Sequence, residues 1–266
     1  MDADSRQAKI LKLLDQQDRV EVEDLSRLLD VSLQTVRTDL RELSARNALS
    51  RVHGGAVRMS LAANRAYADR RKLNANGKLA IATLAADLIP ENCSITVNIG
   101  TTTEQVSRAL SGHRGLTVLT NNINIINTMM GNSMLGGQTK NLILVGGTVR
   151  QSDGAVVGEE AVDFISRFKV DFAIVGASAL DPDGAIMDHD VSEVAVARAI
   201  LKNARTKVLV CDSSKFERTA PVRICALEDL DYLITDRPVS EEYALIAQRA
   251  ETQILTALPN ESSEND

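Results

Sequence analysis

Hydrophobic positions in the first sixty residues recur every three or four places, which is the period of an amphipathic helix. The spacing holds over 6–14, 22–29 and 33–44. Ser32 directly precedes the third stretch, and a serine there is a favourable helix cap. Two short helices joined to a third by the tight turn 30–32 predict a helix-turn-helix, the geometry that places its last helix against a groove of DNA.

From about residue 78 onward the pattern changes, because short runs apolar on both faces alternate with helical stretches. Strands without a polar face must be covered on both sides, which predicts an α/β domain with a mostly parallel sheet between two layers of helices. The predicted strands are 94–99, 117–120, 141–145, 172–175, 207–211 and 232–235, and the predicted helices include 78–88, 103–109 and 193–204.

These patterns divide the chain into four parts. We predict a DNA-binding domain over 1–57, an arginine-rich polar linker over 58–77 and a larger α/β domain over 78–258. The acidic residues 259–266 have the composition of a disordered tail.

Charge and composition narrow the class of protein. The formal net charge of −6 argues against a protein that coats nucleic acid non-specifically, but it allows a local basic face. The three cysteines are widely spaced and form no CxxC pair or Cys/His cluster, so we interpret them as reduced thiols and expect neither a metal site nor a cofactor. We find no secretory leader and no apolar run of ~18 residues, so we expect a cytoplasmic protein that does not contact the membrane.

The outward face of the third predicted helix carries side chains that suit DNA recognition. Arginine reaches phosphates or guanine edges, glutamine pairs with adenine, and threonine contacts a thymine methyl or a phosphate. The alternating segment 49–57 then turns at two glycines, which predicts a β-wing and therefore a winged helix-turn-helix. An ordinary solvated surface is the alternative for the helix alone, and the adjoining turn and wing favour DNA. The predicted DNA-binding residues are Ser32, Gln34, Thr35, Arg37, Thr38, Arg41, Arg51 and His53.

A glycine- and threonine-rich turn, Gly100–Thr103, separates a predicted strand from a helix. Gly100 lets the backbone approach an anion, and the amides and hydroxyls that follow can donate to phosphate oxygens, although a simple capped turn is an equal alternative for the motif alone. Polar clusters follow the other strands too, at the sheet edge where parallel sheets bind ligands, and Lys215 is the natural cation for a phosphate. Asp188 belongs to an acidic loop that suits hydroxyl binding or plain solvation. The predicted effector-binding residues are Gly100, Thr101, Thr102, Thr103, Asn121, Asn122, Gly147, Ser178, Asp188, Asp212, Ser214 and Lys215.

The run LDVSLQTVRTDL at 29–40 and the ending RVHGGA at 51–56 resemble the DeoR family of transcriptional repressors. Thr38 stands where that family usually has a second arginine, so its operator sequences do not carry over. The resemblance extends over the larger domain and implies a sensor similar in fold to ribose-5-phosphate isomerase. In that fold a Gly-Thr/Ser loop and the lysine of a D-x-S-K motif hold a phosphate, and both motifs are present at 100–103 and 212–215.

Within the family, the blocks NIGTTTE (98–104), GGTVR (146–150) and DSSKFERTAPVR (212–223) most resemble the members that respond to glycerol 3-phosphate. The resemblance implies a repressor of carbon catabolism genes, released from its double-stranded operator by a phosphorylated small molecule. Because single small modules bind DNA weakly, we expect a homo-oligomer, a dimer or a tetramer.

Three alternatives stay open at this point. The effector can be another sugar or polyol phosphate instead of glycerol 3-phosphate. A sugar-phosphate isomerase is disfavoured because Ser178-Ala179-Leu180 stands where those enzymes carry acidic residues, so we expect no catalytic residues. A purely structural α/β protein is disfavoured by the polar clusters after five strands.

Overall fold

The computed structural model describes residues 2–17, 19–45, 48–52, 54–57, 67–134 and 140–258. The chain forms two compact units, Met1–Asp69 and Arg70–Asp266. Their division lies inside the predicted linker 58–77, of which 67–72 are helical and 75–77 already belong to helix α5 (Ala75–Leu88). His53 and the predicted tail 259–266 lie outside the described residues.

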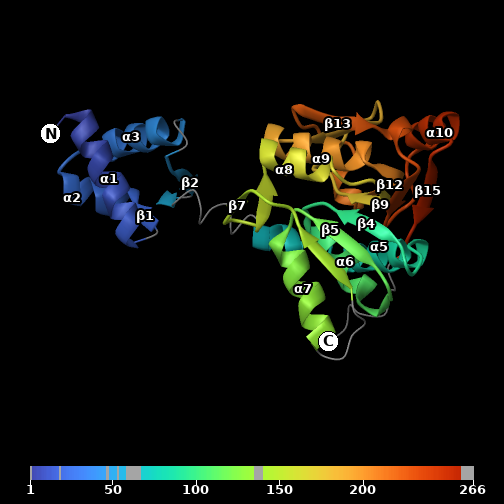
Figure 1. Cartoon of the computed structure of the whole chain (residues 1–266). Helices are drawn as coiled ribbons and strands as arrows, with labels where there is room; N and C mark the ends of the chain where they lie inside the picture. Colours follow the sequence, from blue (N-terminus) through green and yellow to red (C-terminus); the bar gives the residue numbers. More distant parts are fainter. Residues whose placement is uncertain are drawn as a thin grey trace, which may run out of the picture. The chain divides into compact units, whose positions relative to one another are not determined.

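The first unit is a winged helix-turn-helix, as predicted (Figure 1). Helix α2 (Val22–Leu29) is followed by its cap residue Asp30, which adopts the left-handed conformation with φ 50°, and this sharp turn leads into α3 (Leu33–Ala45). The predicted apolar stripes form one core, in which Ile10, Leu25 and Val36 are buried. The elements are α1 (Ala3–Gln17), β1 (Arg19–Glu21), α2 (Val22–Leu29), α3 (Leu33–Ala45), β2 (Ser50–Val52) and β3 (Gly55–Val57), and the antiparallel sheet has the order β1-β3-β2.

A buried polar network fixes α3 to α1. Asp39, only 2% exposed, accepts two hydrogen bonds from the Arg6 guanidinium, and the one from Nη2 to Oδ1 is 2.9 Å long. Gln7 Nε2 donates to Glu42 Oε2 at 2.7 Å and to Asp39 Oδ1 at 3.4 Å. Because α3 carries the predicted DNA-contacting side chains, this network sets the position of the helix that is predicted to enter the groove.

Asp39→Ala should therefore destabilise the first unit by about 2–3 kcal/mol, because hydrogen bonds to charged groups contribute about 1.5–3 kcal/mol. Amide hydrogen exchange of the full chain measures the effect as roughly a 30- to 150-fold loss of protection in α1 and α3. Asp24→Ala is the control, since its pair with Arg27 is exposed and contributes about 0.5 kcal/mol or less. Equal losses in the two variants would contradict the role given to the buried network.

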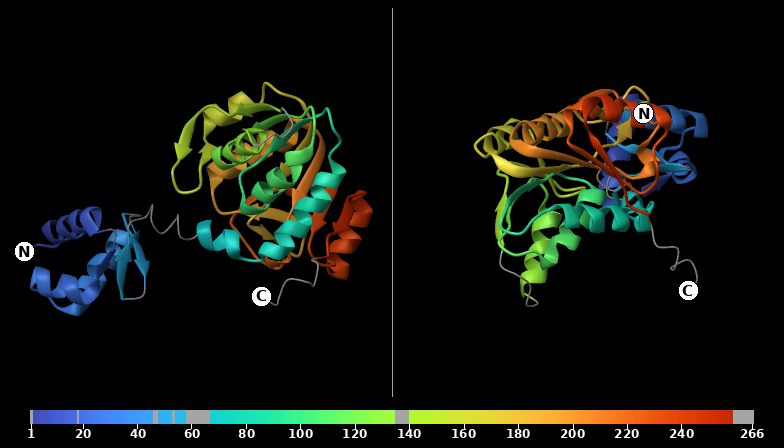
Figure 2. Two further views of the ribbon diagram at one scale, coloured as in Figure 1. Left: turned by 90° about the horizontal axis from the view of Figure 1, so that it is seen from below. Right: turned by 90° about the vertical axis from the view of Figure 1, so that its right-hand side faces the viewer.

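The second unit is built on a seven-stranded parallel sheet, again as predicted, with the order β15-β14-β12-β9-β4-β5-β6. Helices α5, α6 and α7 cover one face and α8, α9 and α10 cover the other (Figure 2). The strands are β4 (Ser94–Val97), β5 (Thr117–Thr120), β6 (Asn141–Leu144), β9 (Val170–Val175), β12 (Ala204–Val210), β14 (Tyr232–Thr235) and β15 (Gln253–Thr256). The helices are α5, α6 (Thr101–Ala109), α7 (Ile123–Met134), α8 (Glu159–Ile165), α9 (Val191–Lys202) and α10 (Glu241–Ala250).

Strand β9 shows why the strands of this unit lack a polar face. Ala173 and Val175 pack into the core with α8–α10, while Phe172 and Ile174 pack on the α5–α7 side. Alternate side chains of one strand thus enter two separate hydrophobic cores, which explains the apolar runs seen in the sequence.

Several elements of the second unit were not predicted. Strand β15 adds an outer edge to the main sheet next to β14. A hairpin follows β6, and a small antiparallel sheet packs near α9. These additional strands are β7 (Thr148–Arg150) and β8 (Ala155–Val157) in the hairpin, and β10 (Ala179–Leu180), β11 (Ala185–Asp188) and β13 (Val222–Ala226) in the small sheet. None of the described helices has the length and apolar composition needed to cross a membrane.

Candidate functional site

The outward stripe of α3 is the first candidate site. Ser32 caps the helix, since its hydroxyl accepts a hydrogen bond from the backbone N–H of Thr35 at 3.1 Å. Arg41 Nη2 donates to Thr38 Oγ1 at 3.3 Å. Positions 34, 37, 38 and 41 share one side of a helix by their spacing, and the three long side chains among them, Gln34, Arg37 and Arg41, are exposed.

The wing brings another cation to the same surface. Arg51 on β2 and Arg37 on α3 line one hollow of about 550 Å³, together with Gly54 and Gly55 and with the carboxylates of Glu21, Glu23 and Asp24. The close pairing of β3 with β1 depends on Gly55, because a Cβ there would lie 1.9 Å from the carbonyl oxygen of Val20. Helix and wing therefore each contribute an arginine to this part of the surface, and arginine is a side chain that contacts the phosphates of a duplex.

The second candidate site lies at the carboxyl edge of the parallel sheet. Along the chain, strands are added outward from β4 in one direction and outward from β9 in the other. Ligands of such sheets bind where the order reverses, which here is between β4 and β9. A Cβ placed on Gly176, just after β9, would lie 3.8 Å from Thr103 Cγ2 and 3.9 Å from the Val210 carbonyl oxygen. The ends of β4, β9 and β12 therefore converge.

The predicted turn Gly100–Thr103 lies at this reversal and opens α6. Gly100 has φ 141°, a conformation that side chains rarely adopt, and it is the residue before the first helical turn. Thr103 is fully buried and its hydroxyl donates to the Gly100 carbonyl at 2.8 Å, so it holds the turn closed. The half-buried Thr101 hydroxyl donates to the Arg70 carbonyl at 3.5 Å. The first backbone amides of α6 have no acceptor inside the helix, and they are the groups available to an anion.

The turn Ser213–Lys215 follows β12, two strands from β4 and thus roughly 10 Å away across the sheet. Asp212 is 1% exposed, and its Oδ1 accepts from the Ser214 amide at 3.1 Å. Its Oδ2 and the buried Ser214 hydroxyl have no hydrogen-bond partner among the described residues. Lys215 is half-buried beside them. A cation, an acceptor and a hydroxyl thus belong to one turn at this edge, a set that suits a hydroxylated anion.

Other predicted effector residues lie around this centre with partners of their own. Ser178, just after β9, donates to Asp188 Oδ1 at 3.0 Å. Asn122 is 1% exposed and its amide nitrogen donates to Glu104 Oε1 at 3.1 Å, so it joins the β5 loop to α6. Asn121 Nδ2 donates to the Val156 carbonyl at 3.1 Å. Gly147 follows β6, which lies two strands from β4 and is therefore farther from the point where the strand order reverses.

Three residues of this edge escaped the sequence prediction: Asn74, Lys78 and Asp236. Lys78 is 2% exposed, and its Nζ donates to the backbone carbonyls of Arg70 and, at 2.6 Å, Leu73. Burial lowers the pKa of the Lys78 ammonium, the Asp212 carboxylate acts against this shift, and the positive charges of Lys215 and Arg70 add to it. The available signal was a lysine inside the apolar stripe of α5, between the buried Gly77 and Ile81.

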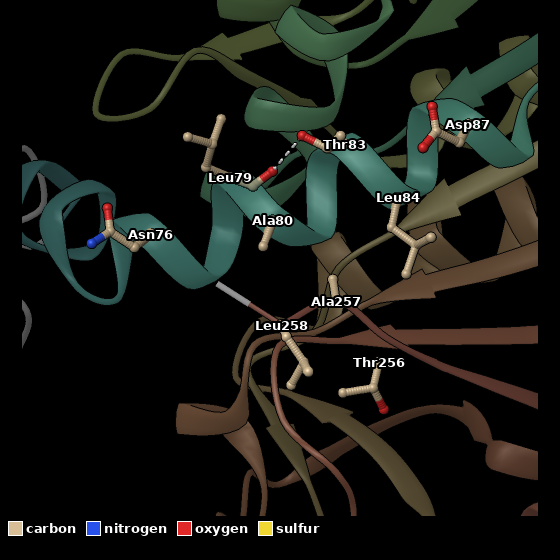
Figure 3. Close-up of a pocket in the computed structure, with 9 residues that line it drawn as sticks. All are labelled: Asn76, Leu79, Ala80, Thr83, Leu84, Asp87, Thr256, Ala257 and Leu258. Carbon is tan, nitrogen blue, oxygen red and sulfur yellow. Dashed lines mark hydrogen bonds between the residues drawn. The ribbon is translucent and has the colours of Figure 1, made fainter. Parts of the chain in front are cut away.

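A separate hollow of about 380 Å³ lies between α5 and the residues that end β15 (Figure 3). Its lining includes Leu79, Leu84 and Leu258, and Asp87 is the only charged residue among the described residues that line it. Because the single charge is negative, this hollow does not suit a phosphate. No group of three or more histidine, cysteine or acidic residues in the described part of the chain is arranged to hold a metal ion.

Two family models match the chain. The "DeoR-like helix-turn-helix domain" matches residues 6–61, and the "DeoR C terminal sensor domain" matches residues 73–237, which is more than half of the chain. The two matches correspond to the two candidate sites.

Named proteins also match over most of the chain. It is 43% identical over 230 residues to the "Glycerol-3-phosphate regulon repressor" of Haemophilus influenzae, covering 86% of this chain and 88% of that protein. The protein of the same name from Escherichia coli is 40% identical and covers 86% of this chain and 89% of its own length. Ribose 5 phosphate isomerase A from Neisseria gonorrhoeae, a solved structure, matches 52% of each chain at 16% identity with a TM-score of 0.36, too weak a likeness to support any conclusion.

Proposed function

The chain belongs to the DeoR family, and on that premise we propose that it is a transcriptional repressor whose effector is a phosphorylated small molecule. The first unit binds operator DNA through the α3 stripe and Arg51. The second unit binds the effector between Gly100 and Lys215. The observation that carries the proposal is the convergence of the α6 N-terminus and the 212–215 turn at one edge of the sheet.

Glycerol 3-phosphate is the effector that fits best. Its phosphate would accept from the first amides of α6 and from Lys215, and its hydroxyls would pair with Asp212 and Ser214. The relatives with 43% and 40% identity carry its name, which supports the same choice. Because the Asp212 carboxylate and the Ser214 hydroxyl can each pair with a ligand hydroxyl, the site favours a small polyol phosphate over an apolar anion.

We propose further that the second unit binds this ligand without converting it. Isomerisation needs a general base beside the reacting carbon. After β9 the chain continues as Ser178-Ala179-Leu180, and the Ser178 hydroxyl already pairs with Asp188. Binding without turnover suits a protein that reports a metabolite level, and the relatives named above are repressors.

A single winged domain offers few base contacts, so we propose that the protein acts in the cytoplasm as a homo-oligomer, a dimer or tetramer, on a repeated operator. An operator gel-shift with the full chain, titrated with glycerol 3-phosphate, tests the proposed function. The expected result is release of the DNA by glycerol 3-phosphate, with no release by glycerol or inorganic phosphate at the same concentration. Release by fructose phosphates alone would move the assignment to another effector, and a complex insensitive to every phosphate would contradict the sensing role.

A further inference from the structure

The chain segment 70–78 joins both turns of the effector site to the part of the chain that leads back to the first unit. We propose that Asn74, Lys78 and Asp236 form a joint through which occupancy of the site is passed to that segment. This inference rests on the proposed function, because it assigns the regulation of the same site.

The first half of the joint holds the turn that carries Lys215. Asp236 follows β14, is 1% exposed, and accepts from the Ser213 amide through Oδ1 at 2.6 Å. Its Oδ2 accepts from the Ser213 hydroxyl at 3.2 Å. Since Ser213 begins the turn that presents Lys215, Asp236 is a positioning residue for that cation.

Asn74 connects this turn to the segment before α5. Its amide nitrogen donates to Asp236 Oδ2 at 2.8 Å and lies 3.5 Å from Asp212 Oδ1. Asn74 itself adopts the left-handed conformation with φ 51°, immediately before the first residue of α5. A Cβ on Gly77 would lie 2.5 Å from Asp236 Oδ2 and 2.6 Å from Asn74 Oδ1, so the parts are packed without room for independent movement.

The second half of the joint uses the turn at Gly100. The Arg70 carbonyl accepts hydrogen bonds from both Lys78 Nζ and the Thr101 hydroxyl. Arg70 lies in the helical residues 67–72, and Lys78 also holds the Leu73 carbonyl at the end of that helix. A ligand whose phosphate displaces the Thr101 hydroxyl or Lys215 therefore displaces groups that are hydrogen-bonded to the segment 70–78 at two places, Arg70 and Asn74.

The consequence is a division between binding and coupling. An effector changes operator affinity only if it binds the two states of the protein differently. The joint contacts the 213–215 turn directly, is linked to the Gly100 turn through the Arg70 carbonyl, and bonds the end of the 67–72 helix. It is therefore the element whose geometry differs with occupancy. Removing it should leave each site able to bind and weaken the link between them.

Asn74→Gly tests this directly. Glycine accepts the left-handed backbone conformation, so the substitution removes the bridging amide without backbone strain. In the full-length protein we expect the dissociation constants for operator and for glycerol 3-phosphate, each measured alone, to stay within about threefold of wild type. The ratio of operator dissociation constants with and without saturating glycerol 3-phosphate should fall at least about tenfold, within the usual 5- to 150-fold range of such couplings.

Asn92→Gly is the matched control. Asn92 also has a left-handed backbone, with φ 58°, and it precedes β4 at the opposite edge of the same sheet. Its coupling ratio should equal that of wild type. Lys78→Met keeps the apolar stem while removing both donors, and it should reduce coupling as Asn74→Gly does, so that one poorly folded variant does not decide the matter.

Unchanged coupling in folded Asn74→Gly and Lys78→Met proteins would overturn the joint. Complete loss of glycerol 3-phosphate binding in Asn74→Gly would also overturn it, because Asn74 would then belong to the binding site itself. If the wild-type protein responds to no phosphate ester at all, the proposed function fails instead, and that outcome is visible before any variant is made.

Discussion

Lys215→Ala should yield a repressor that binds its operator normally and no longer responds to glycerol 3-phosphate. Lys215 lies in the turn that follows β12, at the same edge of the sheet as the N-terminus of α6. A charge-assisted hydrogen bond contributes about 1.5–3 kcal/mol, so removing it should weaken effector binding roughly 10- to 150-fold.

Isothermal titration of the full-length variant with glycerol 3-phosphate measures that loss, and a gel-shift measures the missing release. Lys202→Ala is the control, because Lys202 is an exposed lysine at the C-terminal end of α9, next to the start of β12 at the far edge of the sheet. It should bind and respond as wild type does. Wild-type effector affinity in the Lys215→Ala protein would contradict the placement of the phosphate at this turn.

Arg37→Ala should have the opposite effect, a loss of operator binding with effector binding intact. Arg37 is exposed on the outward stripe of α3 and lines one hollow with Arg51. An arginine that contacts a base edge is worth about 1–3 kcal/mol, which predicts roughly a 5- to 150-fold weaker complex.

Fluorescence anisotropy of a labelled operator at several salt concentrations also distinguishes the type of contact. If Arg37 neutralises a phosphate, the slope of log affinity against log salt falls by about 1, while a base contact leaves the slope nearly unchanged. Arg27→Ala is the control, since Arg27 is an exposed residue of α2 paired with Asp24. Loss of glycerol 3-phosphate binding in Arg37→Ala would contradict the separation of the two sites.

The sequence was most informative where hydrophobic spacing is dense. Helix α2 begins and ends where its apolar stripe predicts, because Val22, Leu25 and Leu29 are buried along it. Strands β5 and β14 match their predicted bounds, because each contains a run of three buried residues. Helix α5 begins three residues before its predicted start, since the residues that open it are polar and small. Their helical conformation is favoured by packing against Asp236, which no local pattern reveals.

The short pairings could not be predicted, because their partners are distant in the chain. Strand β1 spans three residues and exists through its pairing with β3, more than thirty positions away. Strand β13 pairs with β11 across the whole of α9 and β12. Three-residue runs show no alternation that a sequence pattern can detect, so tertiary contacts determine them.

The candidate effector site was predicted in outline. The rule that carboxyl ends of parallel strands share one edge brought Gly100, Ser178 and Lys215 together correctly in topology. It did not reveal which polar side chains form hydrogen bonds within the protein. The Thr103 hydroxyl donates to the Gly100 carbonyl of its own turn, and the Asn122 amide donates to Glu104. Those assignments depend on atoms a few ångströms apart. The contribution of each predicted residue to ligand binding stays a prediction.

A crystal structure of the full-length protein with glycerol 3-phosphate is the most direct test of the central claim. We expect the phosphate between the first amides of α6 and Lys215 Nζ, at hydrogen-bonding distances of about 2.7–3.2 Å, with a ligand hydroxyl on Asp212 or Ser214. A phosphate bound anywhere else, for instance in the hollow between α5 and the end of β15, would contradict the account.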